Sequence, residues 1–148
     1  MNNFTFRAQE ALQQASRIAA ERQHQQVDST HLFAALLAQD EGLITTLLRK
    51  LEVPVPELQE RLNRELTLIP QIRLQPAGNV GQIYITPELK AVLDEAQKYA
   101  RKMKDEYIST EHLLLGMLES NSLVRALLAE YDVDSDDIMQ SLADVRGH

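Results

Sequence analysis

The chain has 148 residues and a formal net charge of −7, from 15 Lys and Arg against 22 Asp and Glu. This acidic balance argues against a domain that binds nucleic acid or anionic lipid, because both ligands attract basic surfaces. Cysteine is absent, which excludes disulfides, thiol catalysis and Cys-based metal sites.

Apolar residues make up 44% of the chain, enough to bury a core, and most of them are Leu, Ala, Ile and Val. Leu and Ala favour helices, so an all-α domain is the first expectation. The first six residues lack the basic and apolar regions of a signal peptide, and no apolar run approaches the roughly 20 residues of a membrane span. We therefore expect a soluble, cytoplasmic protein.

Four helices are predicted in the first half of the chain. The first begins after Thr5, whose hydroxyl can accept a backbone N–H, and its apolar residues recur with a 3.6-residue period. The second follows Asp28 and contains the phrase Ser-Thr-His-Leu-Phe-Ala-Ala-Leu-Leu at residues 29–37. The third carries the leucines of residues 43–51, and the fourth begins near Pro56.

Residues 66–85 follow these helices and contain two Pro and two Gly, which exclude one continuous helix. A free linker is usually polar, whereas this segment is apolar at Leu68, Ile69, Ile72, Leu74, Ile83 and Ile85. We expect it to be an extended apolar linker that packs on the helices.

The second half of the chain repeats the first. A shift of 81 residues, which becomes 80 after one deletion, matches Thr5 with Thr86, Leu12 with Leu93, His31 with His112, and Leu62 with Leu142. The register holds over about 60 positions, which indicates an internal duplication.

The duplication predicts the organisation of the whole chain. Repeat one is expected at 4–66, the linker at 67–85 and repeat two at 86–146. We expect two pseudo-symmetric four-helix repeats that form one compact all-α domain over 1–148. A pseudo-twofold pairing lets two equal units bury equivalent faces against each other.

The sequence shows no arrangement of reactive groups typical of an enzyme. Its five glycines do not form a phosphate-binding loop, and there is no G-x-S-x-G motif. His31 and His112 stand just before equivalent apolar runs without H-E-x-x-H spacing, which favours a packed or capping role over catalysis or zinc binding. We predict no catalysis, metal or cofactor for the chain itself.

Residues 132–137, Asp-Val-Asp-Ser-Asp-Asp, partly match a calcium-binding loop. The sixth place of such a loop is Gly and the twelfth is Glu, but these places hold Asp137 and Ala143. Acidic residues also favour a helix N-terminus, where they complement the helix dipole. The pattern therefore favours the start of a helix near Asp136.

Four stretches carry a resemblance to a known family: residues 4–12 (Phe-Thr-Phe-Arg-Ala-Gln-Glu-Ala-Leu), the two His-Leu phrases, and residues 83–89 (Ile-Tyr-Ile-Thr-Pro-Glu-Leu). Together with the duplication they resemble the Clp amino-terminal domain, found at the front of Clp AAA+ unfoldases. The resemblance covers essentially the whole chain. Residues 68–72, Leu-Ile-Pro-Gln-Ile, look most like the ClpB disaggregase branch, and ClpC is the next most similar.

The resemblance implies a larger parent protein. That parent would be a hexameric ATPase that uses ATP and magnesium and threads aggregated polypeptides through a central pore with the DnaK system. The ATPase modules are absent from this chain, so we expect an isolated domain that is monomeric by itself.

The resemblance also implies a substrate-recruiting groove. By position its residues are Thr5, Leu93, Asp105 and Glu111, with His112 beside them where relatives often have an apolar residue. Unfolded or aggregated polypeptides are the expected ligands. The alternative is a ClpC-type domain that docks adaptor proteins.

ClpC-type domains carry a Thr-Glu-His phrase in each repeat, and its Glu helps to bind phosphoarginine. Here the second copy is Thr-Glu-His at 110–112, but the first is Ser-Thr-His at 29–31. A matched pair of phosphoarginine sites is therefore not expected.

Overall fold

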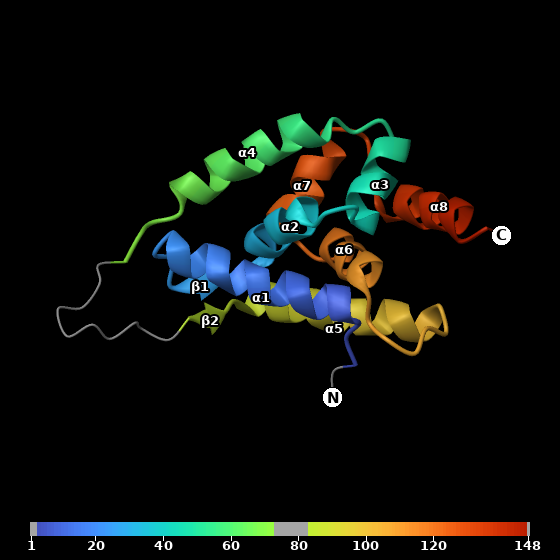
Figure 1. Ribbon diagram of the computed structural model, residues 1–148, viewed down its shortest axis with the longest axis horizontal. Helices are drawn as coiled ribbons and strands as arrows, with labels where there is room; N and C mark the ends of the chain where they lie inside the picture. Colours follow the sequence, from blue (N-terminus) through green and yellow to red (C-terminus); the bar gives the residue numbers. More distant parts are fainter. Residues whose placement is uncertain (1–2, 73–82, 148) are drawn as a thin grey trace.

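The computed structural model describes residues 3–72 and 83–147. In the first repeat the helices are α1 (Phe6–Glu21), α2 (Ser29–Ala38), α3 (Leu43–Lys50) and α4 (Val55–Leu68). In the second they are α5 (Pro87–Lys102), α6 (Thr110–Glu119), α7 (Leu123–Ala129) and α8 (Ser135–Arg146). The predicted all-α fold with four helices in each repeat is confirmed (Figure 1). The predicted repeat boundaries stay a prediction, and α4 runs two residues beyond the first of them.

The helices begin where local chemistry can satisfy their free N–H groups. The Thr5 hydroxyl accepts from the backbone N–H of Ala8 at 3.2 Å, and the Thr86 hydroxyl accepts from that of Leu89 at 3.0 Å. In the acidic segment, Asp134 and Asp137 each accept a hydrogen bond from the other's backbone N–H, which caps α8. The acidic residues thus mark a helix start, as predicted.

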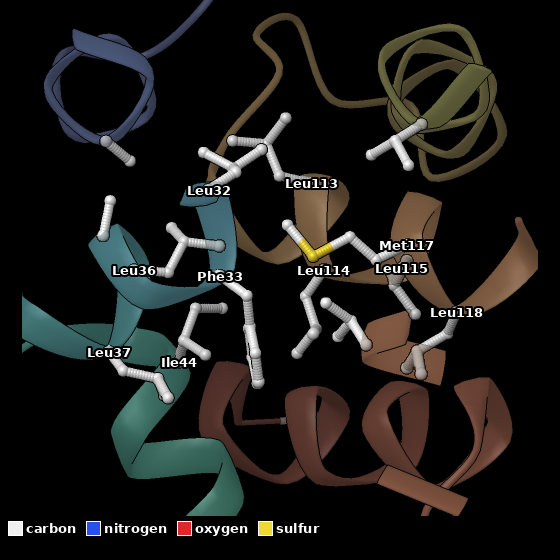
Figure 2. Packing of buried hydrophobic residues seen from close by; sticks show 14 of the residues in the cluster. Leu32, Phe33, Leu36, Leu37, Ile44, Leu113, Leu114, Leu115, Met117 and Leu118 are labelled. Carbon is white, nitrogen blue, oxygen red and sulfur yellow. The ribbon is translucent and has the colours of Figure 1, made fainter. Parts of the chain in front are cut away.

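Helices α2 and α6 form the centre of the molecule. Both are buried on nearly all sides, as expected for helices that are apolar around their whole circumference. Their side chains meet between the two helices in Figure 2, with Leu32, Phe33 and Leu36 from α2 beside Leu113, Leu114 and Met117 from α6. Helix α1 packs on α2 and α5 packs on α6.

The close approach of α5 to α6 depends on Gly116. A Cβ atom at this position would lie 2.4 Å from the carbonyl oxygen of Val92, too close for a real contact, and 3.0 Å from the backbone nitrogen of Ala96, which is tight. The equivalent residue of the first repeat is Ala35, so α1 and α2 leave room for one methyl group there.

The two repeats exchange equivalent contacts. The backbone N–H of Thr5 donates to the carbonyl of Ile108 at 2.9 Å, and the equivalent N–H of Thr86 donates to that of Val27 at 3.0 Å. Helix α1 contacts α6 while α2 contacts α5, and α2 contacts α7 while α3 contacts α6. This reciprocity is the predicted pseudo-twofold pairing.

The ends of the linker attach to the first repeat. The parallel strands β1 (Gln26–Val27) and β2 (Tyr84–Ile85) pair, and the backbone N–H of Ile72 donates to the carbonyl of Gln23 at 2.8 Å. Ile83 packs against the core, as expected for an apolar linker. Leu74 lies outside the described residues.

The prediction of packing was wrong for Leu68 and Ile85, which are 74% and 58% exposed. Leu68 follows the buried Leu66 by two helical positions, which turns it to the opposite side of α4. Ile85 is held by backbone pairing with Val27, so its side chain remains at the surface.

Candidate functional site

A polar network lies at the N-terminus of α6. His112 is the third residue of this helix, and its Nδ1 accepts the backbone N–H of Ser109 at 2.9 Å. Its Nε2 lies 2.8 Å from Oδ2 of Asp105, in the turn between α5 and α6. Because Nδ1 accepts, the proton of the neutral imidazole sits on Nε2 and is donated to the carboxylate.

The second half of the network is an arginine from α8. The guanidinium of Arg146 donates to Oε2 of Glu111 at 2.8 Å and to Oδ2 of Asp105 at 3.1 Å. Burial opposes ionisation of Asp105, but the hydrogen bonds from Arg146 and His112 hold the pKa of that carboxyl below its ordinary value. Asp105 is therefore a carboxylate that bridges a guanidinium and an imidazole.

The structure brings together three of the five predicted site residues: Asp105, Glu111 and His112. Thr5 is adjacent through its backbone bond to Ile108, but its hydroxyl is used in the cap of α1. Leu93 is half-buried on α5, packs against the core and is not part of the network. The assignment of these five residues to a binding site stays a prediction.

Sequence reasoning missed Arg146. It lies 35 positions from Glu111, and no local pattern joins a residue at the end of α8 to the start of α6. Figure 1 shows how the fold does so: the C-terminal end of α8 lies at the same end of the molecule as the α5–α6 turn.

Exposed apolar side chains adjoin the network in sequence. Phe6, directly after Thr5, is 77% exposed, and Tyr107, directly before Ile108, is 51% exposed. Val145, directly before Arg146, is exposed as well. Large exposed apolar side chains around an ordered polar cluster are typical of a surface that binds a partner.

The equivalent positions of the first repeat form a different cluster. Nδ1 of His31 accepts the backbone N–H of Asp28 at 3.1 Å, and its Nε2 lies 2.9 Å from Nδ1 of His24. Both imidazoles are buried. The predicted capping role of His31 and His112 is therefore confirmed in both repeats.

A separate cleft of about 300 Å³ lies between α1, α2 and α4. Ile18, Ala34 and Leu62 contribute apolar lining, and Arg22 and Asn63, which are hydrogen-bonded to each other, contribute polar lining. Nothing in the sequence pattern predicted this cleft, because its lining residues come from three helices and are brought together only by their packing.

Residues 3–72 and 83–147 contain neither a metal-binding cluster nor a helix that could span a membrane. No three His, Asp or Glu side chains gather there in a way that could hold a metal ion. No helix in this part of the chain has the length and apolar content needed to cross a bilayer.

Comparison with known proteins assigns the chain to a family. The model of the Clp repeat (R) N-terminal domain matches residues 3–144. The chain belongs to this family. A ClpB chaperone from Nitratidesulfovibrio vulgaris is 36% identical over 149 aligned positions, which cover 99% of this chain and 17% of that protein. The chain thus spans about a sixth of the length of the ClpB relatives it matches.

Solved structures share the fold. The Hsp104 N-terminal domain from Candida albicans superposes with a TM-score of 0.82 at 24% identity, covering 99% of this chain and 93% of that one. A ClpV N-domain in complex with a VipB peptide superposes with a TM-score of 0.76 at 17% identity, covering 95% and 85%. The Clp N-domain fold predicted from the sequence is confirmed.

Proposed function

We propose that the chain is the substrate-recruiting N-terminal domain of a ClpB-type disaggregase and binds exposed apolar segments of unfolded or aggregated proteins. The observation that carries this proposal is the ordered network of Asp105, Glu111 and Arg146, together with the exposed apolar residues Phe6, Tyr107 and Val145 that directly neighbour Thr5, Ile108 and Arg146 in the sequence. The ClpB relatives that match the full chain support it. The peptide held by a ClpV N-domain of the same fold is consistent with it.

The proposal includes the parent protein. Its AAA+ modules would bind ATP and magnesium, assemble as a hexamer in the cytoplasm and cooperate with the DnaK system. An unfolded segment must be ordered to bind, so the affinity of one domain should be on the order of micromolar or weaker. Six such domains on a hexamer would compensate by avidity.

The first experiment is a titration of the 15N-labelled chain with permanently unfolded, reduced casein. The proposal expects amide shifts that include Thr5, Asp105, Glu111 and His112, and it also includes Leu93 in the binding site. Glu111→Ala and Leu93→Asp should weaken binding while the fold is kept. Shifts confined to α4 and the linker ends would contradict this site.

The two helix caps provide a matched control. Thr5→Ala and Thr86→Ala each remove one capping hydroxyl and should each cost about 1 kcal/mol of stability. Only Thr5 borders the proposed site, so only Thr5→Ala should also weaken binding of casein. Equal effects of both variants on binding would mean that Thr5 acts through stability alone.

An adaptor-docking role is the second candidate, and the cleft between α1, α2 and α4 favours it. The cleft is lined by both apolar and polar side chains and by none of the residues of the network, so it offers a second surface to a folded partner. Pull-downs from native lysate and from heat-denatured lysate distinguish the two roles. A folded partner enriched only from native lysate, and lost in Ala34→Glu, would favour docking.

A further inference from the structure

The carboxylates of Asp105 and Glu111 already hold a cation, and it belongs to the same chain. Nη2 of Arg146 bonds both of them, at 3.1 Å and 2.8 Å. Arg146 is the last residue of α8, and Gly147 ends the helix in a left-handed conformation with φ of 81°. The ion pairs therefore fasten the C-terminal end of α8 to the α5–α6 turn.

The fold itself does not require these charges. The equivalent residues of the first repeat are His24 for Asp105, Thr30 for Glu111 and Leu66 for Arg146. That repeat forms the same four helices, and α4 extends past Leu66 without any such ion pair. The three charged residues are thus a feature of the second repeat alone, which points to a role other than building the helices.

The two sides of the ion pair differ in their access to water. The side chain of Glu111 is only 8% exposed, whereas that of Arg146 is 33% exposed and ends a helix. Partly exposed ion pairs contribute little to stability, so a second cation from solution can compete with Arg146. Glu111, by contrast, stays in place and needs a cationic partner there.

We propose that Arg146 is a built-in competitor at this edge of the substrate site. It occupies Asp105 and Glu111 when the site is empty, and an arginine side chain of a bound unfolded segment displaces it. A guanidinium is the expected ligand because the pair already holds one in a two-carboxylate geometry. This inference rests on the proposed function.

Two consequences follow from the displacement. Segments with arginine next to apolar residues are preferred, since the exposed apolar residues Tyr107 and Val145 are close in sequence to Asp105 and Arg146. Binding of such a segment also frees the C-terminal end of α8 from the α5–α6 turn.

The test compares Arg146→Gln with Arg125→Gln, an equal loss of charge on α7 outside the network. The probes are two fluorescein-labelled unstructured peptides of alternating Leu, Ser and Arg, one of them with citrulline in place of every Arg. If Arg146 occupies the pair in about 90% of molecules, its removal tightens binding of the arginine peptide about tenfold. Binding of the citrulline peptide should be the same in both variants.

Equal affinity of the two variants for the arginine peptide, with wild-type casein binding intact, overturns this inference and leaves the proposed function standing. Absence of binding of casein and of both peptides by the wild-type chain overturns the proposed function and this inference with it. In the wild-type chain, the 15Nε–1H signal of Arg146 gives an independent readout. The arginine peptide should move it towards the position of a free guanidinium, and an unmoved signal at saturation would contradict displacement.

Discussion

His24 and His31 show how a buried polar pair fixes its own protonation. Nδ1 of His31 accepts the backbone N–H of Asp28, so its Nε2 carries the proton and donates it to Nδ1 of His24. His24 in turn bonds the backbone of Leu66. A proton added to Nδ1 of His24 would place two N–H groups against each other in this chain of hydrogen bonds.

This arrangement predicts a loss of stability in mild acid. Burial, the neighbouring His31 and Arg22 hold the pKa of His24 below its ordinary value of 6.5, against the opposing charge of Asp28. The fold therefore favours the neutral ring, and its full contribution is present above pH 6.5. Below that value His24 is protonated in the unfolded chain but stays neutral in the folded chain. The free energy of unfolding should therefore fall by up to about 1.4 kcal/mol per pH unit.

Urea unfolding at pH 7.5, 6.5 and 5.5 measures this effect. His24→Gln is the matched control, because the Gln amide can accept from His31 and donate to Leu66 without titrating. The slope between pH 6.5 and 5.5 should be shallower in the variant. An identical slope in both proteins would assign the acid sensitivity to other groups.

At the scale of helices, the two repeats differ in how closely their first two helices pack, α1 on α2 and α5 on α6. Gly116 lets the backbone of α6 approach Val92 and Ala96 of α5, whereas Ala35 stands at the equivalent place between α2 and α1. A single methyl group thus separates two otherwise similar helix pairs.

Gly116→Ala is expected to destabilise the protein, although an alanine in an exposed helix usually stabilises it by about 1 kcal/mol over glycine. The new Cβ would lie 2.4 Å from the Val92 carbonyl oxygen, and α5 and α6 must move apart. We expect a net loss of about 1–3 kcal/mol, as for other overpacked cores. Thermal unfolding measures it, and a rise in melting temperature would mean that the helices separate at little cost.

At the scale of the whole molecule, neither repeat is complete by itself. Helices α2 and α6 bury each other's side chains, and the segment before each first helix pairs with the loop of the other repeat. The core therefore belongs to both halves.

Residues 1–72 and 83–148, expressed as separate peptides, should accordingly be largely unfolded. Each would expose the apolar face that its partner covers in the whole chain. A domain this small buries too little other apolar surface to compensate for that loss. Mixing the two peptides should restore helical circular dichroism with a concentration-dependent midpoint. A cooperative melting transition in either half alone would show that the repeat is an independent folding unit.

The sequence by itself determined the helices and their duplication. Helical periodicity, the capping Thr5 and Thr86, and the 81-residue shift are local or strictly repetitive signals, and each was reproduced in the structure. The family resemblance rests on the same short phrases, and it correctly indicated the Clp N-domain family.

Only the tertiary structure decided how the candidate site is composed. It joined Arg146 to Asp105 and Glu111, packed Leu93 partly against the core, and left Leu68 and Ile85 at the surface. These outcomes depend on where the end of α8 meets the α5–α6 turn and on which side of each element faces the other repeat. Such contacts join residues far apart in the chain, and their geometry is set by the packing of α2 against α6 rather than by any local sequence pattern.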